Sequence, residues 1–365
     1  MNHLEFIKNE IGIDLFWRDK LKINDKGINY RPFKYKRLNS SRFCYYLLMI
    51  GWRLPLVTLN LLFFLISLLK STKEINTLKE KSIWLESSFK STLIRERNQI
   101  ENMIIIDLRK QAYLNYLDRR YRTRCFIKSL KTISFDLSSV SFSNKLQYLD
   151  IYRLICFHEF VVQINRLALS LHLTSHYDRW TMAASHAFTK GIEIWQHGLL
   201  SDQFKLDQKL GNVVRINYLR EQDVIWWQNN ICSASCDFKE QHQQLQFTEQ
   251  LESIDVLMIS NPGYVKEEFY FLKELMKLPQ FLNKNIAYKP HPLYSNLKYK
   301  RTINSLKRLG VFIMEPKQFP KVTLVIHNGS TLGYEYETMG INVIDYSFIS
   351  VSVLADKFAS QKIFV

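Results

Sequence analysis

Two short segments in the C-terminal third carry residue types suited to binding a phosphate group. The first, residues 328–331 with the sequence Asn-Gly-Ser-Thr, follows the apolar run 322–327 and opens a helix-like stretch that ends at Gly340. A helix that starts in this way directs backbone N–H groups and a positive dipole end at an anion, and the Ser330 and Thr331 hydroxyls add donors. An ordinary capping box accounts for the same residues. The segment therefore predicts a phosphate-binding turn or a plain helix cap.

The second segment, residues 288–292 with the sequence Tyr-Lys-Pro-His-Pro, ends another predicted strand. Its two prolines restrict the backbone and keep His291 out of a helix. Open α/β sheets bind their ligands at the carboxyl ends of the strands, which is where this segment lies. There His291 can donate to a phosphate oxygen and Lys289 can supply positive charge. A structural turn histidine is the alternative.

A third histidine, His197, ends a predicted strand in the first half, within the sequence Gln196-His197-Gly198. An imidazole titrates near neutrality, so at a strand end it can act as a general base that deprotonates a hydroxyl. Asp178, in the polar cluster 175–180, can orient this histidine or be the base itself. A satisfied turn histidine is again the alternative.

The helices and strands that must position these residues are predicted from changes in composition and apolar spacing along the chain. Residues 71–124 lack Gly and Pro and space their apolar side chains by three, four and longer steps, which predicts one or two long helices. Beyond residue 130, short apolar runs alternate with helix-like stretches, as in α/β proteins. The predicted strands are 191–196, 212–217, 254–260, 285–289, 311–314, 322–327 and 341–345, and the predicted helices among them include 265–277 and 331–339.

The predicted organisation has three parts. Residues 1–130 form a helical region, 131–248 a first Rossmann-like domain and 249–365 a second one, and the polar stretch 237–250 is the linker between the domains. No G-x-G-x-x-G or Walker A pattern follows any predicted strand, which argues against a dinucleotide dehydrogenase and a P-loop kinase.

Charge and cysteine usage limit the partners and the compartment. Fifty Lys and Arg against thirty-four Asp and Glu leave a net charge of +16, which favours anionic partners such as nucleic acid, phospholipid head groups or acidic substrates. Basic residues interleave with aromatics at 31–37 and 119–124, but no zinc-finger spacing, RNP motif or helix-turn-helix pattern accompanies them. Five scattered cysteines argue against a disulfide-built secreted protein and for a reducing compartment.

An apolar run near the N-terminus, residues 44–69, raises the question of a membrane. Arg53 and Pro55 interrupt it, and its clean part is about 16 residues where a span needs roughly 20. Basic residues flank it, so it suits an anchor lying on an anionic leaflet. Peripheral membrane contact, a buried core helix and a true span all remain open.

Taken in order, the three motifs resemble those of bacterial surface-polysaccharide transferases with a GT-B architecture. Similar His-Pro and Ser/Thr motifs mark enzymes that use CMP-sugars, including capsule Kdo transferases and bacterial sialyltransferases, and also CDP-glycerol transferases of teichoic-acid synthesis. The resemblance covers about residues 170–347. It implies an α/β, GT-B-like fold with two Rossmann-like domains facing a cleft, preceded here by the N-terminal helical region.

The resemblance also implies roles for individual residues. The implied donor phosphate and nucleotide site comprises Lys289, His291, Pro292, Gly329, Ser330 and Thr331, with Glu335 or Glu337 reaching the nucleotide ribose. His197 or Asp178 is the implied base. The acidic Asp/Glu-Asp/Glu-Gly motif of many sialyltransferases is not evident in the sequence, so His197 fits the Gln-His-Gly enzymes better.

The activity implied by the resemblance is inverting transfer of a sugar of the Kdo or sialic-acid type from a CMP-linked donor to a glycan or lipid-linked acceptor, in capsule or lipopolysaccharide synthesis. CDP-glycerol or polyol-phosphate transfer is the alternative, and a basic nucleic-acid-binding protein is the alternative of another class. We expect no metal and no cofactor besides the nucleotide-activated donor, and no nucleic-acid partner. The expected location is cytoplasmic, peripheral at the inner face of the cytoplasmic membrane.

Overall fold

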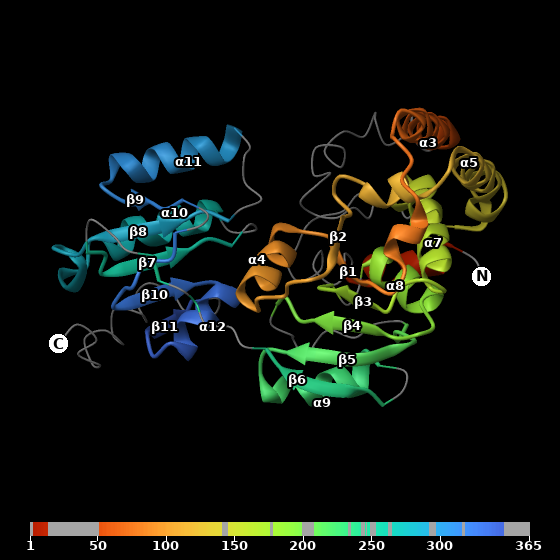
Figure 1. Ribbon diagram of the computed structural model, residues 1–365. Coiled ribbons are helices and arrows are strands. Elements are labelled where there is room, and N and C mark those ends of the chain that lie inside the picture. The colour runs from red at the N-terminus through yellow and green to blue at the C-terminus, as the bar shows by residue number, and fades with distance from the viewer. Residues whose placement is uncertain are drawn as a thin grey trace. The chain divides into compact units, whose positions relative to one another are not determined.

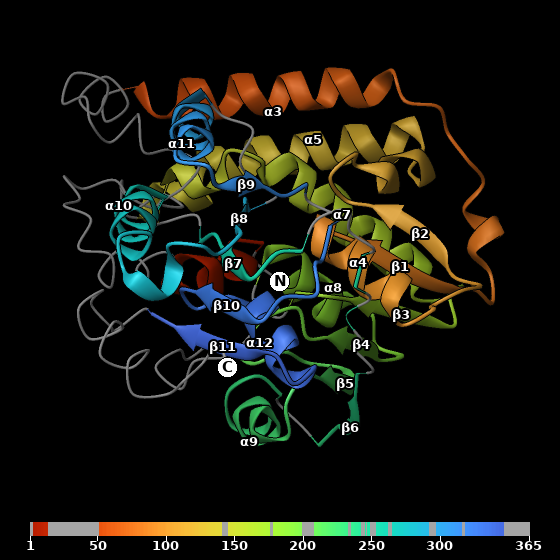
Figure 2. The ribbon, with the colours of Figure 1, turned by 90° about the vertical axis from the view of Figure 1, so that its left-hand side faces the viewer.

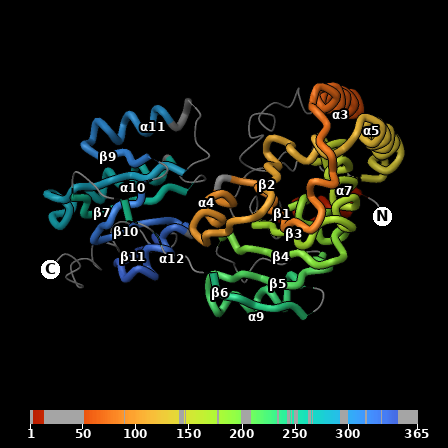
Figure 3. The backbone as a smooth tube through the Cα atoms, in the orientation of Figure 1, coloured from red at the N-terminus to blue at the C-terminus, as the bar shows by residue number. Residues whose placement is uncertain are grey.

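The computed structural model describes residues 3–13, 51–140, 145–175, 178–198, 208–232, 235–241, 245, 247–248, 253–261, 265–291, 297–315 and 318–346. The chain divides into two compact units, Met1–His242 and Gln243–Val365 (Figure 1). Each unit is built on one parallel sheet with helices packed around it, so the expected pair of parallel-sheet α/β domains is confirmed. Figure 3 follows the chain from red to green through the first unit and from teal to blue through the second.

The first unit contains a six-stranded sheet in the order β2-β1-β3-β4-β5-β6, in which all neighbouring strands are parallel. The strands are β1 (Ser82–Glu86), β2 (Ile104–Asp107), β3 (Ser170–Leu173), β4 (Ile192–Trp195), β5 (Val213–Tyr218) and β6 (Asp237–Glu240). From β1 the chain first adds β2 on one side and then returns to add β3 on the other. The strand order therefore reverses between β1 and β3, which is the topological switch point where such sheets bind ligands.

The first unit has six helices in its described residues, and they pack around the sheet. They are α3 (Arg53–Leu68), α4 (Phe89–Arg97), α5 (Arg119–Ser134), α7 (Ile151–Ile164), α8 (Arg179–Ala187) and α9 (Glu221–Asn230), joined by the short 3-10 turns η1 (Glu5–Ile7), η2 (Ile75–Leu78), η3 (Ala112–Tyr116), η4 (Asp136–Ser139) and η5 (Leu146–Tyr148). Helix α7 packs against α8 and α5, and α3 lies outside them against α5 and α7 (Figure 2). Among the described residues, no helix is long and apolar enough to cross a membrane.

The prediction of one or two long helices over residues 71–124 is wrong. This stretch contains β1 and β2, paired in parallel from Ile83 opposite Ile104 to Glu86 opposite Asp107. Strands buried in a parallel sheet are short continuous apolar runs, which periodicity alone does not separate from buried helix. Residues 82–86 and 104–107 therefore belong to the sheet of the first unit, so the region 1–130 that was predicted to be helical contributes two strands to that sheet.

The second unit contains a five-stranded parallel sheet in the order β11-β10-β7-β8-β9. Its strands are β7 (Val256–Ile259), β8 (Ile286–Lys289), β9 (Phe312–Ile313), β10 (Leu324–His327) and β11 (Asn342–Asp345), and its helices are α10 (Val265–Leu275), α11 (Leu297–Arg308) and α12 (Thr331–Thr338), with the 3-10 turn η6 (Pro279–Phe281). All five strands predicted here are confirmed, as are the two predicted in the first unit, now β4 and β5. The chain order reverses between β7 and β10, as in a Rossmann half-domain.

Successive side chains of the second sheet pack into two separate hydrophobic cores, one on each face of the sheet. One core joins Val256 and Met258 of β7 to α10 and α11, and the other joins Leu257 and Ile259 of the same strand to Tyr336 of α12. Successive side chains of a strand point to opposite faces, so each strand is buried on both sides. Helices α10 and α11 therefore cover one face of this sheet, and α12 covers the other.

Candidate functional site

The switch point of the second sheet brings together two turns that follow neighbouring strands. After β7 the chain continues through Ser260 and Asn261, and after β10 it continues through Asn328. The Asn261 side-chain amide donates to the Asn328 carbonyl oxygen at 2.7 Å. This bond ties the two turns together at the edge where doubly wound sheets bind ligands.

The turn from β10 into α12 has the backbone geometry that the segment 328–331 requires. Gly329 has a φ of +59°, and its N–H donates to Asp345 Oδ1 at 3.2 Å. The Ser330 N–H donates to His327 Nδ1 at 3.0 Å. Within the described part of the chain, the Ser330 side chain makes no capping hydrogen bond to α12. The helix start therefore does not use the plain cap, which leaves the Ser330 hydroxyl for another role; the Thr331 side chain lies outside the described residues.

Helix α12 approaches β10 so closely that its third residue must be glycine. A Cβ placed on Gly333 would lie 2.0 Å from Cδ2 of the His327 ring, far inside van der Waals contact. His327 is 6% exposed, and burial lowers its pKa although the charges of Asp345 and Glu337 act to raise it. The neutral ring accepts the Ser330 N–H bond and so fixes the start of α12.

Lys289 and His291, at the end of β8, have different surroundings. Lys289 is 4% exposed; its Nζ donates to the carbonyls of Glu315 at 3.0 Å and Gln318 at 2.6 Å and lies 4.4 Å from the centre of the Phe319 ring. This ammonium group binds the segment after β9, and the predicted supply of charge to a phosphate stays a prediction. His291 is half-buried beyond the end of β8, the strand next to β7. Pro292 lies outside the described residues.

A buried carboxylic acid under the switch point was not predicted from the sequence. Glu268 of α10 is 0% exposed; its Oε2 accepts from Ser260 Oγ at 2.9 Å and from the Tyr288 hydroxyl at 2.6 Å, and its Oε1 accepts from the Asn261 N–H at 2.5 Å. Burial raises the pKa of Glu268 to about 7, against the lowering effect of these hydrogen bonds. Glu268 thus holds Asn261, the residue that joins the two turns.

A signal for Glu268 exists in the sequence. With Phe271, Leu272 and Leu275 it occupies one stripe of α10, at spacings of three, four and seven residues. A lone acidic residue in an apolar stripe must be protonated or hydrogen-bonded once it is buried. Its position therefore marks a polar site beneath the helix.

The two glutamates of α12 differ in how far they are exposed. Glu335 is half-buried one turn into the helix, and Glu337 is exposed. The Thr338 hydroxyl donates to the Glu335 carbonyl oxygen at 2.8 Å, which is an ordinary helical contact. A role for either carboxylate at a nucleotide ribose stays a prediction.

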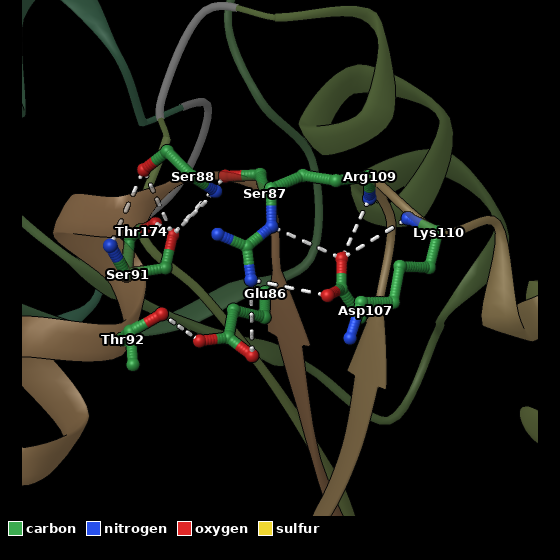
Figure 4. A network of polar contacts seen from close by, with 9 residues as sticks. All are labelled: Glu86, Ser87, Ser88, Ser91, Thr92, Asp107, Arg109, Lys110 and Thr174. Carbon is green, nitrogen blue, oxygen red and sulfur yellow. Dashed lines mark hydrogen bonds and ion pairs between the residues drawn. The ribbon is translucent and has the colours of Figure 1, made fainter. Parts of the chain in front are cut away.

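The switch point of the first sheet carries a cluster of hydroxyl groups that the sequence did not single out. Ser88 and Ser91 form the capping box of α4, with both reciprocal bonds at 3.2 Å. Ser91 Oγ also lies 2.5 Å from Thr174 Oγ1, at the end of β3 (Figure 4). The contact joins the loops that follow β1 and β3, the pair of strands between which the order reverses.

Beside the hydroxyl cluster, Arg109 bridges carboxylates at the ends of two adjacent strands (Figure 4). Its guanidinium donates to Asp107 at 3.1 and 3.0 Å and lies 3.7 Å from Glu86 Oε2. Burial acts to raise the pKa of Asp107, but hydrogen bonds from Arg109 and from the Lys110 N–H hold it below its usual value. This edge of the sheet is therefore polar and charged as well as hydroxyl-rich.

His197 joins the same edge through Thr174. Its Nδ1 donates to the Thr174 carbonyl oxygen at 2.5 Å, and burial, with the charge of Lys90, lowers its pKa to about 4. The ring is therefore neutral at physiological pH with its proton on Nδ1, which makes Nε2 the basic atom. Its neighbour Gln196 is fully buried: its amide donates to Asp223 Oδ2 at 2.6 Å and accepts from Trp227 Nε1 at 3.0 Å. In Gln-His-Gly, the glutamine anchors the strand end that presents the histidine.

Asp178 is the N-cap of α8, and its predicted role as a base or orienting group stays a prediction. Its carboxylate caps α8 by accepting from the Thr181 N–H at 2.8 Å. Burial, together with the charge of Glu10, raises its pKa. Short polar residues directly before a helix are preferred caps, which accounts for this contact. Across the described residues, no three His, Cys, Asp or Glu side chains are grouped so that they could hold a metal ion.

Comparisons with known proteins give likeness of fold only. The sequence matches no protein-family model and no curated protein. Among solved structures, UDP-N-acetylglucosamine 2-epimerase from Rickettsia bellii has a TM-score of 0.41 at 13% identity, covering 73% of this chain and 78% of its own. MurG from Acinetobacter baumannii has a TM-score of 0.37 at 10% identity, covering 77% of this chain and 90% of its own. A mutant of the O-GlcNAc transferase from Thermobaculum terrenum has a TM-score of 0.29 at 11% identity, covering 81% of this chain and 59% of its own.

Proposed function

We propose that this protein is a nucleotide-sugar glycosyltransferase of the GT-B type, in which the second unit binds the donor and the first unit serves the acceptor. The observation that carries the proposal is the β10–α12 turn at the switch point of the second sheet. There Gly329 opens the turn, the Ser330 hydroxyl is not used as a cap, and Asn261 ties the turn to the end of β7. His291 follows the next strand, β8.

The chemistry of such a transferase matches these groups. A nucleotide leaving group develops negative charge on its phosphate, and fixed donors at that position lower the barrier without reorganising. The N-terminus of α12, the Ser330 hydroxyl and the imidazole of His291 are the proposed donors of this kind, and the sequence adds Thr331 to them. On the first unit, the neutral His197 is the proposed base for the acceptor hydroxyl, supported by the hydrogen bond that keeps its proton on Nδ1.

The proposed donor is CMP-linked, with a sugar of the Kdo or sialic-acid type, and the product belongs to a bacterial surface polysaccharide. This choice rests on the resemblance of the ordered motifs Gln-His-Gly, Lys-Pro-His-Pro and Ser-Thr. The alternative, CDP-glycerol or polyol-phosphate transfer, is supported by the motif Gln196-His197-Gly198, because His197 as base fits the polyol-phosphate and other Gln-His-Gly enzymes better.

The test is saturable nucleotide binding by the full-length protein. Isothermal titration with CMP, CDP, UDP and GDP should detect a cytidine nucleotide in preference to the others. His291→Ala and Ser330→Ala should each weaken that binding by about tenfold or more, because each removes one hydrogen bond to a charged phosphate.

Two matched variants control for the substitution itself. His186→Ala removes an exposed histidine of α8, and Ser305→Ala removes a half-buried serine of α11 in the second unit; both should bind the nucleotide like the wild type. Binding that is equal in all five proteins would refute the phosphate site, and a preference for UDP or GDP would refute the cytidine donor alone.

A further inference from the structure

The inner side of helix α3 combines apolar side chains, such as the buried Leu56, with two hydrogen-bonding ones. Asn60 and Ser67, on its inner side, are fully buried. The Asn60 amide donates to the Leu149 carbonyl at 3.1 Å and accepts from the Tyr152 N–H at 2.8 Å, and Ser67 Oγ lies 2.7 Å from the Tyr152 hydroxyl. A surface helix normally turns its apolar stripe inward and its polar side to water. Helix α3 departs from this pattern on its outer side, because its polar Asn60 and Ser67 face the unit together with Leu56 while aliphatic side chains face outward.

The outer side of α3 carries exposed aliphatic side chains, which we call the leucine stripe. Its members are between 40% and 87% exposed and consist of Leu54, Leu61, Leu62, Leu65, Ile66 and Leu69. Their spacing by four, seven and eight residues places them along one face of the helix. Contiguous exposed apolar surface of this kind marks a site of interaction, whereas scattered single leucines do not.

The helix beside the leucine stripe, α5, carries exposed basic side chains. Helices α3 and α5 run side by side (Figures 1 and 2), and Arg53 at the start of α3 donates to the Ser134 carbonyl at the end of α5 at 3.3 Å. The exposed cations of α5 are Arg119, Arg120, Arg124, Lys128 and Lys131. Of these, Lys128 pairs with Glu159 at 3.7 Å, and Asp118 and Asp136 are exposed acids at the two ends of the helix. Cations outnumber acids along this helix.

We propose that the leucine stripe docks on the surface of an anionic lipid bilayer, with α3 lying in the plane of the interface. An interfacial helix immerses its apolar side to a depth of roughly 5–10 Å while flanking Lys and Arg hold lipid head groups. Both components are present: aliphatic side chains on α3 and cations on α5. At 16 residues α3 lies on the membrane and does not cross it. This docking does not depend on the proposed function.

The composition of the stripe favours lipid over a protein partner. Energetic centres of protein interfaces are enriched in Trp, Tyr and Arg, and leucine is under-represented there. The stripe is aliphatic along its length and lies on a convex helix, without a pocket-filling aromatic. The net charge of +16 complements an anionic leaflet in addition.

The test is flotation of the full-length protein with vesicles. Wild type should float with vesicles of mixed phosphatidylcholine and phosphatidylglycerol and much less with phosphatidylcholine alone. The double variant Leu62→Glu, Leu65→Glu should lower the partition coefficient by about tenfold or more, because two charges enter the immersed face. The variant Arg120→Gln, Lys131→Gln should lower binding to the anionic vesicles several-fold and leave binding to the neutral ones unchanged.

A matched control replaces two exposed apolar side chains elsewhere. Ile225 and Leu282 are each 65% exposed, so Ile225→Glu, Leu282→Glu adds the same charge without touching α3 and should float like wild type. Circular dichroism and thermal melting confirm that each variant is folded. The proposal is overturned if wild type does not float, if both glutamate pairs reduce flotation equally, or if sedimentation shows a wild-type dimer that the α3 variant alone dissociates, which would make a second copy the occupant.

Discussion

Glu268 is a carboxylic acid held in an apolar stripe, and its environment gives the second unit a titration near neutrality. Three donors converge on it, from Ser260, Asn261 and Tyr288, yet burial dominates and raises its pKa to about 7. Because Asn261 also bonds the Asn328 carbonyl, the protonation state of Glu268 bears on the turn that we propose for phosphate binding.

We expect this residue to make the second unit less stable as the pH rises. The pKa of Glu268 is about 7 in the folded state and near 4.5 in the unfolded chain, so the folded state binds the proton more tightly. Its stabilising contribution is complete below about pH 4.5 and is lost as the pH rises through 7. Each pKa unit corresponds to about 1.4 kcal/mol. The variant Glu268→Gln stays neutral at every pH. The difference in melting temperature, variant minus wild type, should therefore increase between pH 5 and pH 8.

The control for this prediction lies on the same helix. Glu274 is half exposed and pairs with Lys277 at 2.7 Å. Glu274→Gln removes an exposed carboxylate, so the difference in its melting temperature from wild type should stay nearly constant over the same pH range. A constant difference for Glu268→Gln as well would contradict the raised pKa.

At the residue scale, the sequence predicted which residues follow the ends of strands. It could not predict which partners their side chains contact. The segments around His197, His291 and Ser330 all follow strands, as predicted. The ligand or catalytic roles predicted for Lys289 and Asp178 stay predictions, and the structure adds that Lys289 donates to backbone carbonyls and that Asp178 caps a helix. Such tasks depend on partners distant in the sequence, which motif spacing does not encode.

At the scale of elements, the contact of α12 with β10 is the one most dependent on a single residue type. Gly333 lies against the His327 ring, which in turn accepts the N–H of Ser330. A side chain at position 333 must push the helix off the strand or displace the ring. Either movement shifts the start of α12, where the phosphate would bind.

We therefore expect Gly333→Ala to affect stability and binding together. Its Cβ would lie 2.0 Å from the imidazole, and overpacking of this kind costs about 1–3 kcal/mol. Chemical denaturation should report that loss, and titration with the cytidine nucleotide should show weaker binding. In Gly51→Ala, the new Cβ meets no atom of the protein within 4 Å, so this variant should match wild type in both assays. Unchanged binding in a destabilised Gly333→Ala would separate the packing role from the site.

The strands show where sequence periodicity succeeds and where it fails. Seven strands beyond residue 130 were predicted because polar or glycine turns bound each apolar run. Strands β1 and β2 were missed because their apolar clusters lie between charged, Lys- and Glu-rich flanks that are typical of helices. Only the pairing of Ile83 with Ile104 and of Ser82 with Ser170 places them in the sheet.

At the scale of the whole molecule, the two units have separate hydrophobic cores. The first unit contains one large core and the second contains the two smaller ones on either side of its sheet. The division at His242 falls inside the polar stretch 237–250, where the sequence predicted a linker, although that stretch begins with β6. The position of the boundary was thus readable from composition, but the strand at its start was not.

Separate cores lead us to expect two unfolding transitions in differential scanning calorimetry. A ligand stabilises only the unit that binds it, by about 2.7 kcal/mol at 100 times its Kd. A cytidine nucleotide should therefore raise the transition of the second unit and leave the other in place. Glu268→Gln, which changes the second unit alone, identifies which transition is which. A single transition would contradict independent unfolding of the two units, and a shift confined to the first unit would contradict the assignment of the donor to residues 243–365.

The outer strands of the two sheets also bear on how this chain behaves at high concentration. An unpaired strand edge is a template for pairing with another chain, and proteins suppress such pairing with charge or with very short edge strands. At one edge of the first sheet, β6 carries Asp237, Lys239 and Glu240, all exposed, and at one edge of the second sheet β9 is two residues long. These two edges are therefore poor seeds for cross-chain β-pairing and aggregation, despite a composition that is 47% hydrophobic.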